Sequence, residues 1–304
     1  MNNLVYCVYG AATERQVRWG GYDWRLHGSE NYIHEALFSI LSAIHRERSS
    51  AAGWRLVIYT DDPRPFSRFD AIIEPLDAGR LREWAGPAKF VHRRKIFVLQ
   101  HALRTYGRSV LVDTDTYFLR PPRNLFEKVS AGNAIMHMRE AQLRRVPHLA
   151  SLCEALCSAP FEVRGRSFKF TSDWLIWNSG VIGIDPVDEP LLDDVVRLTD
   201  AIHERSPSNQ SEQIAFAVLL QESTSLRETD EVVYHYWPAH LREPFHELLA
   251  KLLSEFPNGD LNELSARLYP LRPRASLYKS AKARVKTLLF KAGWTGVGMR
   301  SSAF

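Results

Sequence analysis

The first two thirds of the chain alternates short β-forming runs with segments of helical periodicity, and no other feature restricts the fold as strongly. The expected strands are 4–9, 54–60, 71–73, 109–112, 133–138, 181–184 and 231–236. The expected helices are 30–48, 90–106, 142–157, 191–203 and 212–220. Strands that alternate with helices at this spacing predict an α/β fold built from βαβ units around a mostly parallel sheet.

Composition excludes several protein classes. The chain has 304 residues, of which 45% are hydrophobic and 24% charged, so it can bury a substantial core in one large domain and is neither disordered nor collagen-like. No apolar run approaches the ~18 residues that a membrane span requires. Three cysteines without a zinc-like spacing are typical of reduced cytosolic thiols, and the first residues lack a basic leader, so we expect a cytoplasmic protein.

Charge is distributed unevenly along the chain. Residues 265–304 contain nine Lys or Arg and no Asp or Glu, and subtracting these nine charges from the net charge of +4 leaves −5 for the first 264 residues. An acidic body is a poor nucleic-acid surface, so no nucleic-acid partner is expected. We expect a domain at 1–256 and a basic, helical extension at 257–304. The extension either lies peripherally on an anionic membrane surface through 265–304 or docks on the domain.

Two carboxylates follow a buried strand and form the strongest chemical motif. Asp113 and Asp115 are two residues apart directly after the apolar run 109–112, and in extended backbone their side chains point to the same side. Ligands of open α/β sheets bind beyond the carboxyl ends of the strands. The pair therefore indicates a hard-oxygen site for Mg²⁺ or Mn²⁺, whereas the alternative interpretation is an Asp-rich turn.

The D-x-D motif at 111–115 is followed by Leu-Arg-Pro-Pro, a basic segment at 90–95 precedes it, and the segments 177–184 and 234–237 come later in the chain. In this order the four segments resemble those of the GT-A-fold, nucleotide-sugar-dependent glycosyltransferases, and most of all those of glycosyltransferase family 8 and its relatives. The segment 177–184, Trp-Asn-Ser-Gly-Val-Ile-Gly-Ile, is similar to the family's "F-N-A/S-G-V" strand, and 234–237 resembles its late "H-Y/F" segment. The resemblance covers roughly 4–240 and implies a single GT-A-like domain with a mixed central sheet, followed by the helical extension.

The resemblance also implies a metal site. Asp113 and Asp115 would hold Mn²⁺ (or Mg²⁺) against the donor diphosphate, and His235 would complete the ligand set. From the residues alone, His235 is better explained as a histidine packed among aromatic side chains. Arg94 or Lys95 would neutralise phosphate or pair with an aspartate of the motif, or belong to a solvated turn.

Further residues are assigned to the donor sugar by the same resemblance. Asn178 would contact the sugar, and Glu212 and Gln213 would lie at its reacting face. The Ser-Glu-Gln sequence at 211–213 stands where the family often has Asp-Gln-Asp, a departure that leaves open which residue acts on the anomeric carbon. Glu212 and Gln213 are equally well described as first-turn residues of a helix capped by Ser211.

The nucleotide would bind at the ends of the first two strands. Tyr9, Gly10 and Ala11 follow the first strand, Asp61 follows the second, and Thr114 lies between the two aspartates of the motif. Gly10 allows the backbone to approach a ligand closely. The alternatives are a packing role for Tyr9 and an ordinary turn at Asp61.

The function implied is transfer of a hexose from a nucleotide diphosphate sugar, UDP-linked in this interpretation, to a hydroxyl of a glycan or lipid-linked glycan. The similarity to family 8 implies retention of the anomeric configuration. Two alternatives are a sugar-1-phosphate nucleotidyltransferase and a catalytically inactive nucleotide- or sugar-binding relative.

Overall fold

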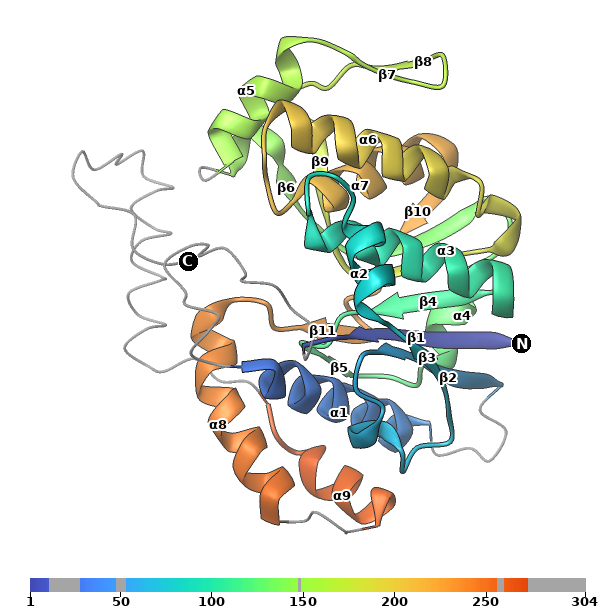
Figure 1. Ribbon diagram of the computed structural model, residues 1–304, viewed down its shortest axis with the longest axis vertical. Helices are drawn as coiled ribbons and strands as arrows, with labels where there is room; N and C mark the ends of the chain where they lie inside the picture. The colour runs from blue at the N-terminus through green and yellow to red at the C-terminus, as the bar shows by residue number, and fades with distance from the viewer. Residues whose placement is uncertain (11–27, 48–52, 147–148, 256–259, 273–304) are drawn as a thin grey trace, which may run out of the picture.

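A computed structural model describes residues 1–10, 28–47, 53–146, 149–255 and 260–272. At its centre is a seven-stranded sheet in the order β10-β6-β9-β4-β1-β2-β3 (Figure 1). Its strands are β1 (Asn2–Val8), β2 (Trp54–Thr60), β3 (Ala71–Pro75), β4 (Ser109–Val112), β6 (Asn133–Gln142), β9 (Leu175–Ile184) and β10 (Ser225–Arg227). The α/β fold is therefore confirmed, and this sheet is the largest of those in the described residues.

The direction of one strand makes the sheet mixed. β1 is parallel to β2 and β4, β2 is parallel to β3, and β10 is parallel to β6. β9 runs antiparallel to both β4 and β6. The mixed sheet implied by the family resemblance is thus confirmed.

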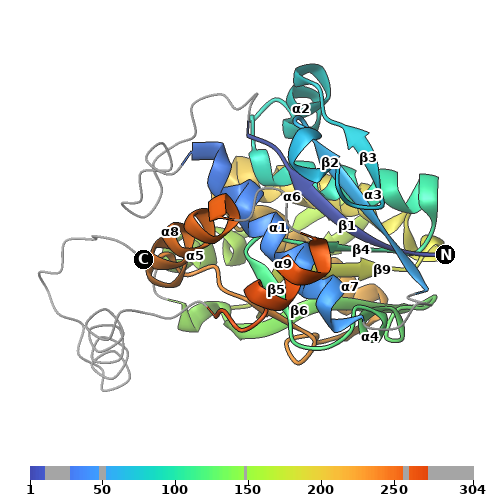
Figure 2. The same cartoon turned by 90° about the horizontal axis from the view of Figure 1, so that it is seen from below.

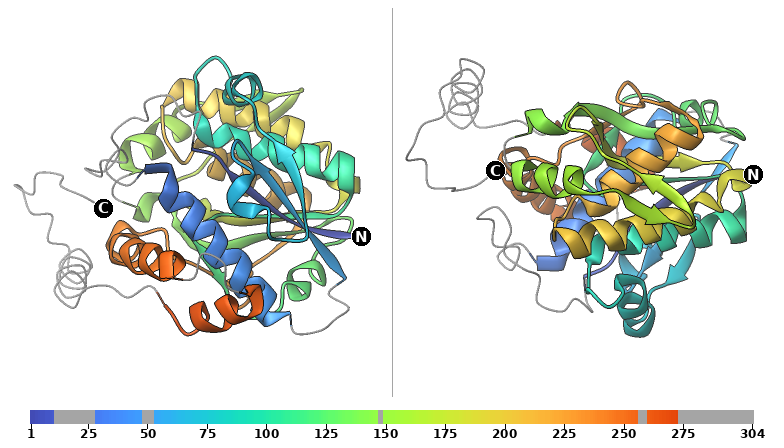
Figure 3. Two further views of the ribbon diagram at one scale, coloured as in Figure 1. Left: turned by 60° about the horizontal axis from the view of Figure 1, so that its bottom comes forward. Right: turned by 90° about the horizontal axis from the view of Figure 1, so that it is seen from above.

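Helices cover both faces of the sheet. They are α1 (Gly28–Arg46), α2 (Ala78–Ala85), α3 (Arg94–Tyr106), α4 (Arg123–Phe126), α5 (Ala150–Ser158), α6 (Leu191–Arg205), α7 (Ser211–Ser223), α8 (Ala239–Glu255) and α9 (Leu261–Leu268). One apolar core joins the sheet to α2, α3, α5, α6 and α7, and a second joins the opposite face to α1. Figure 3 shows α1, α8 and α9 in front in its left view, and α5, α6 and α7 in its right view.

Two predicted boundaries are wrong for the same reason. The helix expected at 142–157 begins only at Ala150, because β6 continues to Gln142, and the strand expected from 181 begins at Leu175. β6 and β9 pair over this extra length with irregular register between Met136 and Met138 and between Arg139 and Ala141. Bulges of this kind interrupt the alternation of apolar and polar residues by which a strand is recognised in a sequence.

Two smaller sheets complete the fold. β11 (Val233–His235) pairs antiparallel with β5 (Thr116–Phe118), and β7 (Phe161–Val163) pairs with β8 (Arg166–Phe168). The first pair is important for the site, because it joins the chain directly after the D-x-D motif to a segment about 120 residues later.

The C-terminal helices pack on α1 (Figure 2). Leu264 and Leu268 of α9 are buried in one cluster with Phe38 and Leu41 of α1. α9 falls within the expected extension 257–304, so this part of it contacts the sheet-bearing body. Residues 273–304, which contain most of the basic residues of the extension, lie outside the described residues. Within the described part of the chain, no helix combines the length and apolar character needed to cross a membrane.

Candidate functional site

The D-x-D motif lies where β4 ends. β4 is fully buried, and the Asp113 backbone N–H continues its pairing with β9 by donating to the Gly180 carbonyl at 2.9 Å. β5 then begins at Thr116, so Asp113, Thr114 and Asp115 form the connection between the two strands. The two carboxylates therefore lie at the carboxyl end of β4, where the sequence predicts the ligand site.

His235 reaches this connection through β11. The register of β11 against β5 places His235 opposite Thr116, and its Nε2 lies 3.0 Å from Oδ1 of Asp115. Asp113, Asp115 and His235 each offer one ligand atom, and these atoms all lie within 4.8 Å of one another. Two carboxylates and an imidazole form a donor set that suits Mn²⁺ or a similar divalent cation. The residues predicted as metal ligands are therefore gathered in one group that can hold a metal ion.

Asn178 of β9 fixes the orientation of the His235 ring. Its Nδ2 donates to Glu140 Oε1 at 2.9 Å, and its Oδ1 accepts from the Gly180 backbone N–H at 2.9 Å. The amide is thereby oriented with Oδ1 toward His235 Nδ1, 2.8 Å away, so Nδ1 is the donating nitrogen of this pair. Nε2 is then directed at Asp115, in the arrangement by which proteins orient a metal-binding imidazole.

Gly180 makes this arrangement possible. A Cβ at this position would lie 2.2 Å from His235 Nδ1, far inside van der Waals contact. The ring packs directly on the β9 backbone because the residue there has no side chain. The "N-S-G" sequence of the predicted strand therefore supplies both the amide that orients the histidine and the space that the histidine fills.

Two cations neutralise the two aspartates from opposite sides. Lys95, in the first turn of α3, places Nζ 2.6 Å from Asp113 Oδ2, and Arg242 of α8 lies 3.3 Å from Asp115 Oδ2. Burial opposes ionisation of Asp115, but Arg242 and His235 outweigh it and hold the pKa of the carboxyl well below its ordinary value. Of the two basic residues considered from the sequence, Lys95 meets the motif. Arg94 instead lies over the Tyr9 ring and donates to the Leu81 carbonyl at 2.8 Å.

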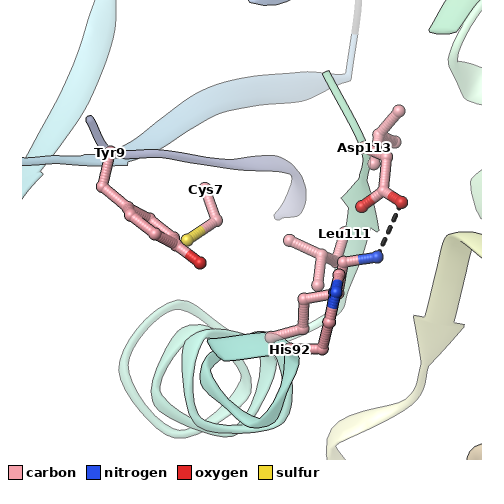
Figure 4. Close-up of a pocket in the computed structure, with 7 residues that line it drawn as sticks. Cys7, Tyr9, His92, Leu111 and Asp113 are labelled. Atoms are coloured by element: carbon pink, nitrogen blue, oxygen red, sulfur yellow. Dashed lines mark hydrogen bonds and ion pairs between the residues drawn. The ribbon is translucent and has the colours of Figure 1, made fainter. Parts of the chain in front are cut away.

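A pocket of about 60 Å³ opens beside Asp113, between the ends of β1 and β4 and the start of α3 (Figure 4). In Figure 4, Cys7 and Tyr9 face His92 across it, and Asp113 lies at its other side. Its lining consists of Cys7, Tyr9, His92, Lys95, Leu111, Val112 and Asp113. The pocket connects Tyr9, predicted to contact the nucleotide, with the carboxylate predicted to hold the metal.

The other nucleotide candidates are placed at two different sites. The Gly10 backbone N–H donates to both carboxylate oxygens of Asp61, at 3.2 and 3.1 Å, so these two residues meet at the ends of β1 and β2. The Thr114 hydroxyl donates to Glu35 at 3.2 Å and is thus directed toward α1. Ala11 lies outside the described residues.

Glu212 and Gln213 lie in the first turn of α7 and contact Ser179, the residue after Asn178 on β9. Glu212 is 1% exposed and hydrogen bonds with the Ser179 side chain, while its Oε1 has no hydrogen-bond partner among the described residues. Burial raises the pKa of its carboxyl to about 7. Gln213 accepts from Ser179 and donates to Glu140 Oε2 at 3.3 Å. Glu140 therefore joins Gln213 to Asn178.

Four functional candidates were not predicted from the sequence: Glu140, Glu35, Arg242 and His246. Glu35 is fully buried in α1, accepts from Arg242 Nε and Nη2 at 2.8 and 2.6 Å, and lies 2.6 Å from His246 Nε2. Arg242 then bridges Glu35 to the Asp115 carboxylate. The available signal was a carboxylate on the face of α1 that also carries Phe38, but its partners are more than 200 residues away in sequence.

Comparison with known proteins adds no family assignment. The chain matches no model of a known protein family, and a search of curated proteins finds no significant relative. The chain is a mixed α/β domain, and its described residues include a possible metal site at Asp113, Asp115 and His235.

Proposed function

We propose that this chain is a metal-dependent glycosyltransferase that moves a hexose from a nucleotide diphosphate sugar, UDP-linked in our proposal, to a hydroxyl of a glycan or lipid-linked glycan. The observation that carries the proposal is the Asp113–Asp115–His235 group, which lies at the end of β4 and shares Asp113 with the adjacent pocket. A divalent cation held by these three residues would supply Lewis-acid stabilisation of the charge on a departing diphosphate.

The groups around the metal ligands support this proposal. Lys95 is an ammonium at the mouth of the pocket, paired with Asp113, and burial disfavours its charge while Asp113 and Glu212 favour it, so that its pKa is raised overall. Its charge is available to a diphosphate that approaches Asp113. Tyr9 gives the pocket a flat wall suited to a base, with the Arg94 guanidinium 4.9 Å from the centre of its ring.

The donor sugar would bind beside Asp115, where it can contact Asn178, Glu212 and Gln213. Asn178 and Gln213 both donate hydrogen bonds to Glu140. Glu212 hydrogen bonds with Ser179, and its raised pKa of about 7 keeps the carboxyl neutral at lower pH. Positioned amide and carboxyl groups can bind sugar hydroxyls and orient the anomeric carbon. Retention of configuration remains the outcome that the resemblance to family 8 implies.

The test is Mn²⁺-dependent hydrolysis of UDP-sugars by the purified chain, with release of UDP and free hexose measured. Asp115→Ala should lower the rate at least ~100-fold, because it removes a metal ligand and the charge partner of Arg242. The matched control is Asp230→Ala, an exposed carboxylate in the loop before β11, which should leave the rate unchanged. No turnover with any nucleotide sugar, together with undiminished nucleotide binding by Asp115→Ala, would exclude the enzyme. Release of pyrophosphate from a nucleoside triphosphate and a sugar phosphate would identify a nucleotidyltransferase instead.

A further inference from the structure

Trp237 presents an indole ring to solvent beside the metal ligands. It lies two residues after His235 and is 43% exposed, and it is the only exposed tryptophan in the part of the chain that the structure describes. An isolated exposed apolar side chain is ordinary on a protein surface. The position of Trp237 and the rigidity of its support distinguish this ring.

Two imidazoles hold the indole in place. The centre of the Trp237 ring system lies 5.1 Å from that of His235 at an interplanar angle of 52°, and 6.4 Å from that of His137 at 80°. Both supports are anchored: His235 by Asn178 and Asp115, and His137 by a hydrogen bond of 3.0 Å between its Nε2 and the Val233 carbonyl. A ring that packs on two anchored imidazoles loses less conformational freedom than an unsupported ring when a ligand covers it.

A carboxylate contacts the amide that orients His235. Glu140 lies three residues after His137 on β6, is exposed, and contacts Asn178, which in turn holds His235. The His235–Asn178 pair therefore contacts an exposed aromatic ring through His235 and an exposed carboxylate, an acceptor of hydroxyl hydrogen bonds, through Asn178. This combination suits a pyranose, whose ring carries an apolar C–H face and a rim of hydroxyl groups.

We propose that Trp237 is a stacking platform for a pyranose ring of the acceptor saccharide, and that Glu140 binds hydroxyl groups of the bound saccharides. The C–H bonds of a sugar carry partial positive charge and pack on the negative face of an aromatic ring. The nucleotide pocket meets the metal ligands at Asp113, whereas Trp237 meets them at His235. A saccharide on the indole thus leaves the pocket free for the donor. This acceptor role rests on the proposed function.

Tyr234 provides a matched control within the same segment. It is 39% exposed, close to the exposure of Trp237, but successive residues of a strand point to opposite faces, so it faces away from His235. Its ring lies against Tyr117 with centres 5.1 Å apart. Exposure alone predicts equal effects of the two residues, whereas the acceptor platform predicts an effect of Trp237 only.

The first measurement observes the indole directly in the folded, full-length protein. The chain is labelled with fluorotryptophan, the Trp237 resonance is identified from its absence in Trp237→Phe, and methyl glucoside, methyl galactoside, methyl N-acetylglucosaminide and lactose are titrated with Mn²⁺ and UDP present. We expect a saturable shift of the Trp237 resonance with at least one of these saccharides. No shift with any of them overturns the proposal.

The second measurement compares variants. Saturation-transfer NMR of the responding saccharide should show about tenfold weaker binding to Trp237→Ala, an intermediate loss with Trp237→Phe, and unchanged binding to Tyr234→Ala. Equal weakening by Trp237→Ala and Tyr234→Ala overturns the platform. If Trp237→Ala does not fold, the shift of the Trp237 resonance in the labelled, unchanged chain still tests the platform. A saturable Trp237 shift, together with no turnover of any nucleotide sugar and undiminished nucleotide binding by Asp115→Ala, would refute the proposed function and leave saccharide binding in place. Hydrolysis without a shift refutes only the platform.

Discussion

At the scale of single residues, the absence of a side chain at Gly180 allows the His235 ring to sit between Asn178 and Asp115. The added methyl group of Gly180→Ala would overlap His235 Nδ1, so the ring must move and lose one or both of its partners. We expect Mn²⁺ affinity, measured by titration calorimetry, to fall by about 10- to 100-fold, the usual effect of losing the partner that orients a metal-binding histidine.

Gly183→Ala on the same strand is the control for this effect. Its added Cβ would meet the side chains of Ile135 at 2.6 Å and Val110 at 2.9 Å, which belong to the core and not to the Asp113–Asp115–His235 group. This variant should lower the thermal midpoint of unfolding while keeping the Mn²⁺ affinity of the unchanged chain. Equal loss of Mn²⁺ affinity in both variants would contradict the role given to Gly180.

The buried carboxyl of Glu212 makes stability depend on pH. Its pKa is raised from 4.5 to about 7, chiefly by burial, so the folded state binds the proton more tightly than the unfolded state. The stability that this group contributes is present at low pH and is lost as the pH rises from about 4.5 through about 7. Gln at this position cannot ionise. As the pH rises through this window, the free energy of unfolding of Glu212→Gln, relative to that of the unchanged chain, should therefore increase by up to roughly 3 kcal/mol.

Urea unfolding of both proteins near pH 5 and near pH 8 measures this difference. Glu222→Gln, on the exposed end of α7, is the control and should follow the unchanged chain at both values. Stability curves of Glu212→Gln and the unchanged chain that stay parallel between the two pH values would show that folding does not raise the pKa of the Glu212 carboxyl.

At the scale of elements, α8 is joined to α1 by a buried ion pair. Glu35 accepts two hydrogen bonds from Arg242 and contacts His246, and all three side chains are buried. Removing one partner of a buried pair leaves the other desolvated without compensation. Glu35→Gln should therefore lower the free energy of unfolding by about 3–5 kcal/mol, measured by chemical denaturation.

An exposed pair on α9 is the control for this prediction. Glu263 and Arg267 lie 2.8 Å apart at i,i+4 and are about half exposed, so Glu263→Gln should cost less than about 1 kcal/mol. A similar cost for Glu35→Gln and Glu263→Gln would mean that the Glu35–Arg242 pair does not hold α8 on α1.

Elements whose signal is local were predictable from the sequence. β1, β2 and β4 are continuous apolar runs, and α1 has its apolar residues at helical spacing, so each was found within a few residues of its observed bounds. The lengths of β6 and β9 were not predictable, because bulges interrupt the alternation along β6. Within the site, the D-x-D pair was found from its strand, whereas His235 required a family resemblance. Glu35 and Arg242 are 207 residues apart, and no local pattern links them.

At the scale of the whole molecule, charge separates into an acidic body and a basic C-terminal segment. In the described body, Asp113 and Asp115 follow the carboxyl end of β4. Asp113 forms an ion pair with Lys95, and Asp115 forms one with Arg242. Residues 273–304 carry seven Lys or Arg and no Asp or Glu. Deletion of 273–304 keeps α9, whose Leu264 and Leu268 are buried against α1, and so tests the basic segment without opening this packing.

We expect the full chain to sediment with vesicles that contain an anionic lipid and to be released by salt, because each basic residue near an anionic surface contributes about 1 kcal/mol and is screened by ions. The chain without 273–304 should bind these vesicles at least ~100-fold more weakly, and should keep the rate of the Mn²⁺-dependent UDP-sugar hydrolysis that we propose for the full chain. Vesicles of neutral phosphatidylcholine are the control for apolar adhesion. Equal sedimentation of the two chains would refute membrane binding by this segment, and lost hydrolysis in the shortened chain would instead favour its docking on the domain.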